Sequence, residues 1–211
     1  MAIIFYVLTA AAILFSVLMQ TVSGIVVLTH YKLIISGVII IFAVMGALLA
    51  VRAASTPERK KRIVYNTTLL LFLYYVFLIG YMLFFDRNYR GAFILVSSNF
   101  VPFKSIMLYF AAWKEHTLTI ANVVLNIVGN IFAFVPMGVF FYLLFKPMRN
   151  FLIYTLSISI CVATVEFVQL ITHTGTCDID DFILNLLGAI IAFGIIKIQI
   201  TQRLFKTLYI L

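Results

Sequence analysis

Residues 33–51 read LIISGVIIIFAVMGALLAV, an apolar run without a single ionisable side chain. A helix that crosses a bilayer needs about 20 mostly apolar residues, so this run is long enough to span a membrane. Other long apolar stretches with few charges are residues 3–29, 63–85, 117–145, 151–172 and 182–200. The sequence therefore predicts an all-α polytopic membrane protein with about six transmembrane helices.

The composition supports this class and excludes others. Hydrophobic residues make up 64% of the 211 residues and charged residues only 10%, against about half and about a quarter in soluble domains. A chain of this length leaves much of its surface exposed, so a soluble core could not bury the apolar excess. A soluble enzyme, a disordered chain and a conventional nucleic-acid binder are therefore excluded.

Basic residues predict the orientation. The connection at residues 52–62 contains five of them, and short basic loops stay in the cytoplasm. With six spans, both termini then lie in the cytoplasm. The predicted inner set is Arg52, Arg59, Lys60, Lys61, Arg62, Lys146, Arg149, Lys197, Arg203 and Lys206, and the outer set is Lys32, Arg87, Arg90, Lys104 and Lys114. The run at residues 59–62 would contact anionic lipid headgroups rather than nucleic acid.

The predicted organisation has three parts. Residues 1–86 form an N-terminal three-helix membrane segment, residues 87–116 an extracytoplasmic loop, and residues 117–211 a C-terminal three-helix segment. Within the outer 86–116 loop, apolar residues recur at helical spacing after Pro102, which suits a first helical turn. We therefore expect an interfacial helix at residues 102–114, with a re-entrant or linker segment without a role as the alternative.

Polar residues of the last three predicted helices converge on one layer. Glu166 lies six residues before the outer end of its helix, roughly 9 Å deep at 1.5 Å per residue, and Gln169 shares its face. An intramembrane carboxylate is costly, which favours a functional role over a structural one. Also in the outer layer are Asn126, Asn130, Asp178, Asp180, Asp181 and Asn185.

Structural roles remain open for several of these residues. Asp180 could cap the helix that follows it, whereas capping is less expected for Asp178 and Asp181. The asparagines could hydrogen-bond to neighbouring helices. Other structural expectations are close helix packing at Gly129, Gly138 and Gly188, a kink at Pro136 with its freed carbonyl bonded to a neighbour, and no disulfide between Cys161 and Cys177.

The chemistry of these residues defines a candidate site. Carboxylate and amide oxygens suit a hard divalent cation such as Mg²⁺, Mn²⁺ or Ca²⁺, with Asp178, Asp180 and Asp181 as candidate ligands. Glu166 and Asp181 are candidate catalytic groups, Glu166 as a general acid/base. The candidate substrate-binding residues are Asn99, Lys104, Asn126, Asn130, Gln169 and Asn185.

Four blocks resemble the VanZ-like family in order and spacing, over residues 95–195. They are Asn99-x-x-Pro102-Phe103-x-x-Ile106, Asn126-x-x-Gly129-Asn130-x-x-x-Phe134-x-Pro136-x-Gly138, Glu166-x-x-Gln169 and Asp178-Ile-Asp180-Asp181-x-x-x-Asn185-x-x-Gly188. Many members carry an arginine shortly before the acidic block, where this chain has Thr-Gly-Thr-Cys at 174–177. The resemblance implies a bacterial, mostly Gram-positive, cytoplasmic-membrane protein, and its founding relative is associated with reduced teicoplanin susceptibility.

Two functions follow as hypotheses. The protein could lower susceptibility to teicoplanin-type glycopeptides by binding or altering a partner at the outer leaflet. The partner would be a membrane lipid, a lipid-linked cell-wall precursor or the antibiotic itself. Alternatively, it could be a metal-dependent membrane enzyme that acts on a lipid-linked, phosphate-bearing headgroup. Transport fits less well, since no chain of ionisable groups crosses the bilayer.

Overall fold

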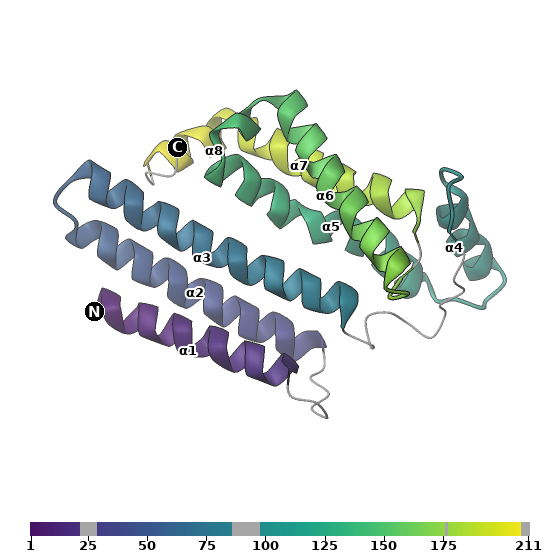
Figure 1. The fold of residues 1–211 in the computed structure, drawn as a ribbon, viewed down its shortest axis with the longest axis horizontal. Helices are drawn as coiled ribbons and strands as arrows, with labels where there is room; N and C mark the ends of the chain where they lie inside the picture. Colours follow the sequence, from purple (N-terminus) through teal and green to yellow (C-terminus); the bar gives the residue numbers. More distant parts are fainter. Residues whose placement is uncertain (22–28, 86–97, 176, 208–211) are drawn as a thin grey trace. The chain divides into compact units, whose positions relative to one another are not determined.

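A computed structural model of the chain describes residues 1–21, 29–85, 98–175 and 177–207. The long helices in these ranges are α1 Ala2–Thr21, α2 Thr29–Ala53, α3 Pro57–Phe84, α5 Ile120–Leu144, α6 Phe151–Ile171 and α7 Ile179–Lys197 (Figure 1). The shorter ones are α4 Lys104–Lys114, the 3-10 helix η1 Lys146–Arg149, and α8 Gln199–Thr207. Apart from one isolated bridge, the described ranges contain no β-structure.

Five of the described helices are long and apolar enough to cross a membrane. Their spans are Ile34–Ala53, Pro57–Phe84, Ile120–Leu144, Phe151–Ile171 and Ile179–Lys197, and Ala2–Val17 forms a shorter apolar helix. Large apolar side chains cover the outside of these helices; Ile3 is 78% exposed and Leu125 69% exposed. Such a surface suits lipid rather than water. The predicted class, an all-α polytopic membrane protein, is confirmed.

Side chains at the helix starts explain several boundaries. Thr119 caps α5 by accepting a hydrogen bond from the Asn122 backbone. Asn150 caps α6 through the N–H groups of Leu152 and Ile153. Asp178 caps α7 through the N–H of Asp180. These are the residue types that satisfy the free N–H groups of a first turn.

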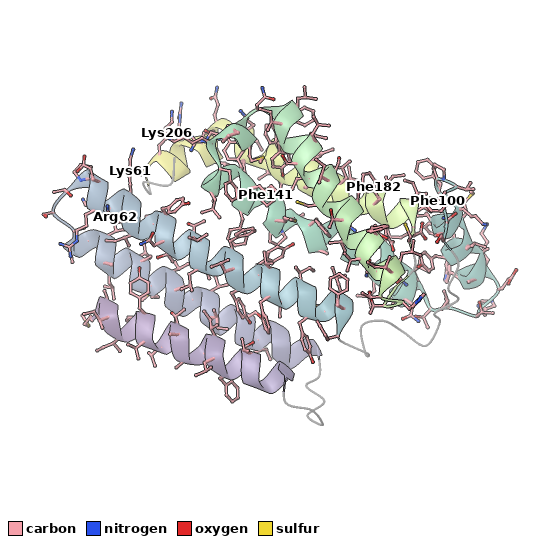
Figure 2. The ribbon with its side chains drawn as sticks, viewed as in Figure 1. Lys61, Arg62, Phe100, Phe141, Phe182 and Lys206 are labelled. Carbon is pink, nitrogen blue, oxygen red and sulfur yellow. The ribbon has the colours of Figure 1, made fainter. Side chains whose placement is uncertain are left out.

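The chain divides into two compact units, Met1–Tyr74 with Arg203–Leu211, and Tyr75–Gln202. In the first unit, α1 and α2 pack together, and hydroxyl groups join both to α3. The Tyr74 hydroxyl lies 3.0 Å from the hydroxyls of both Ser16 and Ser36. Interhelical hydrogen bonds of this kind stabilise helix packing where lipid supplies no hydrophobic drive. Lys61 and Arg62 lie in the first turns of α3, at one end of this unit (Figure 2).

In the second unit, α7 packs against both α5 and α6. The connections between α5, α6 and α7 are short, so α6 runs antiparallel to its neighbours and α5 runs parallel to α7. Gly188 permits the close approach of α7 to α5, because a Cβ there would lie 1.9 Å from the Ile131 carbonyl oxygen. At Gly138 a Cβ would lie 2.2 Å from the Tyr154 hydroxyl, which donates to the Ala189 carbonyl. Close packing at these two glycines is confirmed.

Some expectations were wrong in detail. A Cβ on Gly129 would meet nothing within 4 Å, so this glycine serves no close contact in the described structure. The last span begins at Ile179, where Asp178 caps it, and ends at Lys197 rather than at 200. Residues 22–28 of the first expected span and 86–97 of the expected outer loop lie outside the described residues. As expected, Cys161 and Cys177 are free.

The prediction of a helix at residues 102–114 is confirmed, but its predicted start is wrong. Helix α4 begins at Lys104 instead of Pro102, which lies in a turn. Phe103 precedes the helix with φ at 65°, a left-handed conformation that a side chain disfavours. The local sequence does not impose this start; hydrogen bonds from a distant helix do.

Candidate functional site

The segment that leads into α4 is paired with the segment that leads into α7. Asn99 donates its backbone N–H to the Cys177 carbonyl, and its own carbonyl accepts the N–H of Ile179, both at 2.9 Å. The Asn99 side-chain amide donates to Ser105 and to Asp178, each at 3.0 Å. Two segments almost 80 residues apart are thereby joined at one end of the second unit, the end where Phe100 and Phe182 lie (Figure 2).

Asp180 holds the N-terminus of α4. Its carboxylate accepts hydrogen bonds from the backbone N–H groups of Phe103, Ser105 and Ile106, the last two at 2.8 and 3.2 Å. A carboxylate at this position satisfies free N–H groups and complements the positive end of the helix dipole. Asp180 therefore acts as a cap, but for α4 rather than for its own helix.

Asp178 combines two structural roles. It caps α7, and its carboxylate also accepts hydrogen bonds from the Ser105 hydroxyl and the Asn99 amide. Capping was the less expected role for Asp178, because one helix start does not require three acids. We call Asn99, Ser105, Asp178 and Asp180 the α4 clamp, since their hydrogen bonds fasten α4 to the start of α7.

A second group of polar side chains lies on α5, α6 and α7. Asn130 of α5 donates its side-chain amide to Asp181 of α7. Glu166 of α6 is only 5% exposed, and one of its carboxylate oxygens accepts the N–H of Asp178 at 3.2 Å. The charges of Glu166 and Asp181 interact, so the two carboxylates lie near each other. Asn185, one helical turn beyond Asp181, completes what we call the polar cluster: Asn130, Glu166, Asp181 and Asn185.

One atom of the polar cluster stands out. Asn185 is 6% exposed, and its side-chain oxygen is buried without a hydrogen-bond partner among the described residues. Leaving a buried polar atom unpaired costs about 1–3 kcal/mol, and such atoms are rare in folded proteins. The oxygen of Asn185 is therefore an acceptor available to a group from outside the chain.

A comparison with protein families assigns the chain. The family model described as VanZ/LLP1 matches residues 71–201, more than half of the sequence and all of the residues of the clamp and the cluster. The chain belongs to the VanZ/LLP1 family. No curated protein and no solved structure matches it.

Not every residue expected at the site of this VanZ/LLP1 protein lies there. Asn126 is exposed on α5 and donates its amide to the Asn122 carbonyl one turn earlier, at 2.8 Å. Lys104 is exposed in the first turn of α4. Gln169 lies beneath the connection from α6 to α7, where a Cβ on Gly175 would be 3.1 Å from its amide nitrogen. Asn99 is present at this end, but its side chain serves the clamp.

Two residues of α4 were not anticipated, Ser105 and Tyr109. Burial and the charges of Asp181, Asp178 and Asp180 raise the pKa of Tyr109 to about 12, so its hydroxyl lies in the field of the acids. The two residues are four apart and share a helix face, opposite the exposed Met107 and Phe110. The predicted apolar stripe of this helix implied an opposite face that packs against the rest of the protein. That was the sequence feature from which Ser105 and Tyr109 could have been identified.

The three aspartates do not form a ready metal centre. Both oxygens of Asp178 accept hydrogen bonds from side chains of the clamp, and both oxygens of Asp180 accept them from backbone N–H groups at the start of α4. A divalent cation held by all three aspartates would compete with those bonds. In the parts of the chain that the structure covers, no group of three or more His, Cys, Asp or Glu side chains is placed to hold a metal ion. The metal ligands stay a prediction.

Proposed function

We propose that this VanZ/LLP1 membrane protein binds a polar headgroup at the outer leaflet of the bacterial cytoplasmic membrane. The bound molecule would be an envelope lipid, a lipid-linked cell-wall precursor or a glycopeptide antibiotic, and binding would lower susceptibility to teicoplanin-type glycopeptides. The observation that carries the proposal is the unpaired, buried oxygen of Asn185 in a cluster with the buried carboxylate of Glu166 and the half-buried one of Asp181.

The energetic cost of this arrangement supports a binding role. A carboxylate inside a membrane bundle is costly, and a helix bundle held only by packing would be more stable with apolar residues there. The α4 clamp accounts structurally for Asp178 and Asp180, but not for Glu166 or Asn185. A bound group that donates hydrogen bonds would offset the cost of both residues.

The distribution of charge supports the outward orientation. In the second unit, Lys146 and Arg149 lie between α5 and α6, and Lys197 ends α7, whereas the clamp and the polar cluster lie at the opposite end of the same helices. Basic ends of helices stay on the cytoplasmic side. The polar cluster would then face outward, both termini would be cytoplasmic, and α4 would cover the cluster with its apolar stripe in the lipid interface.

The test is the teicoplanin susceptibility of a sensitive host that expresses the protein. Glu166→Gln and Asp181→Asn each remove a charge from the cluster with almost no change in shape. Glu115→Gln removes a charge from the exposed end of α4 and is the matched control. We expect the two cluster variants, at equal membrane abundance, to return the host to its own susceptibility, and the control to protect fully. Full protection by both cluster variants would contradict the proposal.

A further inference from the structure

Three described side chains of the polar cluster offer acceptors to an incoming group. One carboxylate oxygen of Glu166 accepts the Asp178 N–H, and one of Asp181 accepts the Asn130 amide. In the described residues, the second oxygen of each carboxylate has no hydrogen bond, and the side-chain oxygen of Asn185 is unpaired. Three different side chains thus present an oxygen that can accept a hydrogen bond.

The acids of the cluster also have no basic partner among the described residues. Glu166 and Asp181 lie near Asp178 and Asp180, and none of these four acids forms an ion pair with a lysine or arginine of the described ranges. The hydroxyl of Tyr109 on α4 also interacts with the charges of Asp181, Asp178 and Asp180. When both carboxylates of the cluster are ionised they repel each other, and a bound cation would offset that repulsion.

From these observations we propose that the group bound in the polar cluster is a primary ammonium cation, such as the amine of an ethanolamine headgroup. An ammonium carries one positive charge and three N–H donors, which matches acceptors from Glu166, Asp181 and Asn185. Tyr109 brings an aromatic ring to the same end, and aromatic rings attract ammonium groups. This inference rests on the proposed function and names the chemistry that the binding site selects.

Other ligand chemistries fit the cluster less well. A phosphate would bring its negative charge next to two carboxylates, and like charges repel each other. A divalent cation prefers six or more oxygens, and the nearest further carboxylates, Asp178 and Asp180, are committed to the α4 clamp. A quaternary ammonium has the charge but no N–H donor, so it provides a sharp comparison.

The experiment is native mass spectrometry of the purified protein from phosphatidylglycerol nanodiscs that contain one second lipid. Phosphatidylethanolamine and phosphatidylcholine with identical acyl chains differ only at the headgroup nitrogen, which carries three N–H donors in the first lipid and three methyl groups in the second. We expect phosphatidylethanolamine to be retained about tenfold better, the effect of one charge-assisted hydrogen bond. Asp181→Asn and Glu166→Gln should abolish the preference, and Glu115→Gln should keep it.

Further arms separate the outcomes. Displacement of the retained lipid by soluble ethanolamine would show that the amine suffices, whereas failure of displacement with the preference intact assigns binding to the lipid-borne amine. Equal retention of the two lipids would overturn the ammonium assignment, as would displacement by Mg²⁺. Neither of these two results affects the susceptibility test, so the proposed function could survive them. A thermal melt of each variant shows that it is folded, so that loss of the preference cannot reflect unfolding.

Discussion

At the scale of single residues, spacing along a helix predicted where side chains lie better than it predicted what they do. The four-residue step from Asp181 to Asn185 placed both on one face of α7, and the structure adds Asn130 and Glu166 from two other helices. The roles of Asp178 and Asp180 could not be derived, because their partners in residues 99–106 are remote in sequence. The sequence also could not show that Asn126 bonds to its own helix.

Gly188 offers a prediction at this scale. Gly188→Ala places a Cβ 1.9 Å from the Ile131 carbonyl oxygen, a backbone atom that cannot move without shifting α5. We expect the substitution to lower the free energy of unfolding by about 1–3 kcal/mol, the usual cost of overpacking. The measurement is the midpoint of thermal unfolding in detergent.

Gly194→Ala is the control for this prediction, because it lies on the same helix with nothing within 4 Å of the added Cβ. It should be neutral or slightly stabilising, since alanine favours the helix by up to about 1 kcal/mol. If both variants melt at the temperature of the unchanged protein, α7 and α5 do not approach as closely as described.

At the scale of elements, the long helices were predictable and α4 was predictable only in part. Hydropathy and length define the spans, because a bilayer requires an uninterrupted apolar helix of fixed minimum length. The start of α4 depends instead on Asp180, a side chain from α7 that replaces the cap missing from the local sequence.

Asp180→Asn tests that dependence. The amide keeps one acceptor oxygen but removes the charge that serves three N–H groups, so the start of α4 should open more often. We expect amide hydrogen exchange over residues 103–108 to rise about tenfold, as for the loss of a cap worth about 1–2 kcal/mol. Asp181→Asn should leave this exchange unchanged, and equal exchange in all three proteins would contradict the capping role.

At the scale of the whole molecule, the low content of charge directed the search. Charged residues make up only 10% of the chain, and four of the seven acids are Glu166, Asp178, Asp180 and Asp181. They gather at the end of the second unit that lies opposite Lys146, Arg149 and Lys197. The sequence predicted this separation, because short connections force successive helices to alternate in direction.

Cys177 reports on the orientation of the whole chain. It lies in the connection before α7, and burial together with the charges of Glu166 and Asp178 raises the pKa of its thiol. A membrane-impermeant maleimide should therefore label it in intact cells of a Cys161→Ser variant, but slowly, because only the thiolate reacts. The labelling rate should still rise at a pH where Thr172→Cys, made without Cys177, has levelled off.

Labelling of Cys177 only after the cells are permeabilised would place this end in the cytoplasm and contradict the outward orientation. A labelling rate that matches the Thr172→Cys control at every pH would contradict the raised pKa. The two results are separate, since the first depends on the side of the membrane and the second on the surroundings of the thiol.

The central claim is that the polar cluster binds a group from outside the chain. The most direct measurement is an experimental structure of the protein in nanodiscs formed from its own membrane. We predict a polar atom of a lipid or other ligand within hydrogen-bonding distance of the Asn185 side-chain oxygen and of Glu166 or Asp181. A cluster without such an atom, in which the Asn185 oxygen bonds to another group of the protein, would contradict the claim.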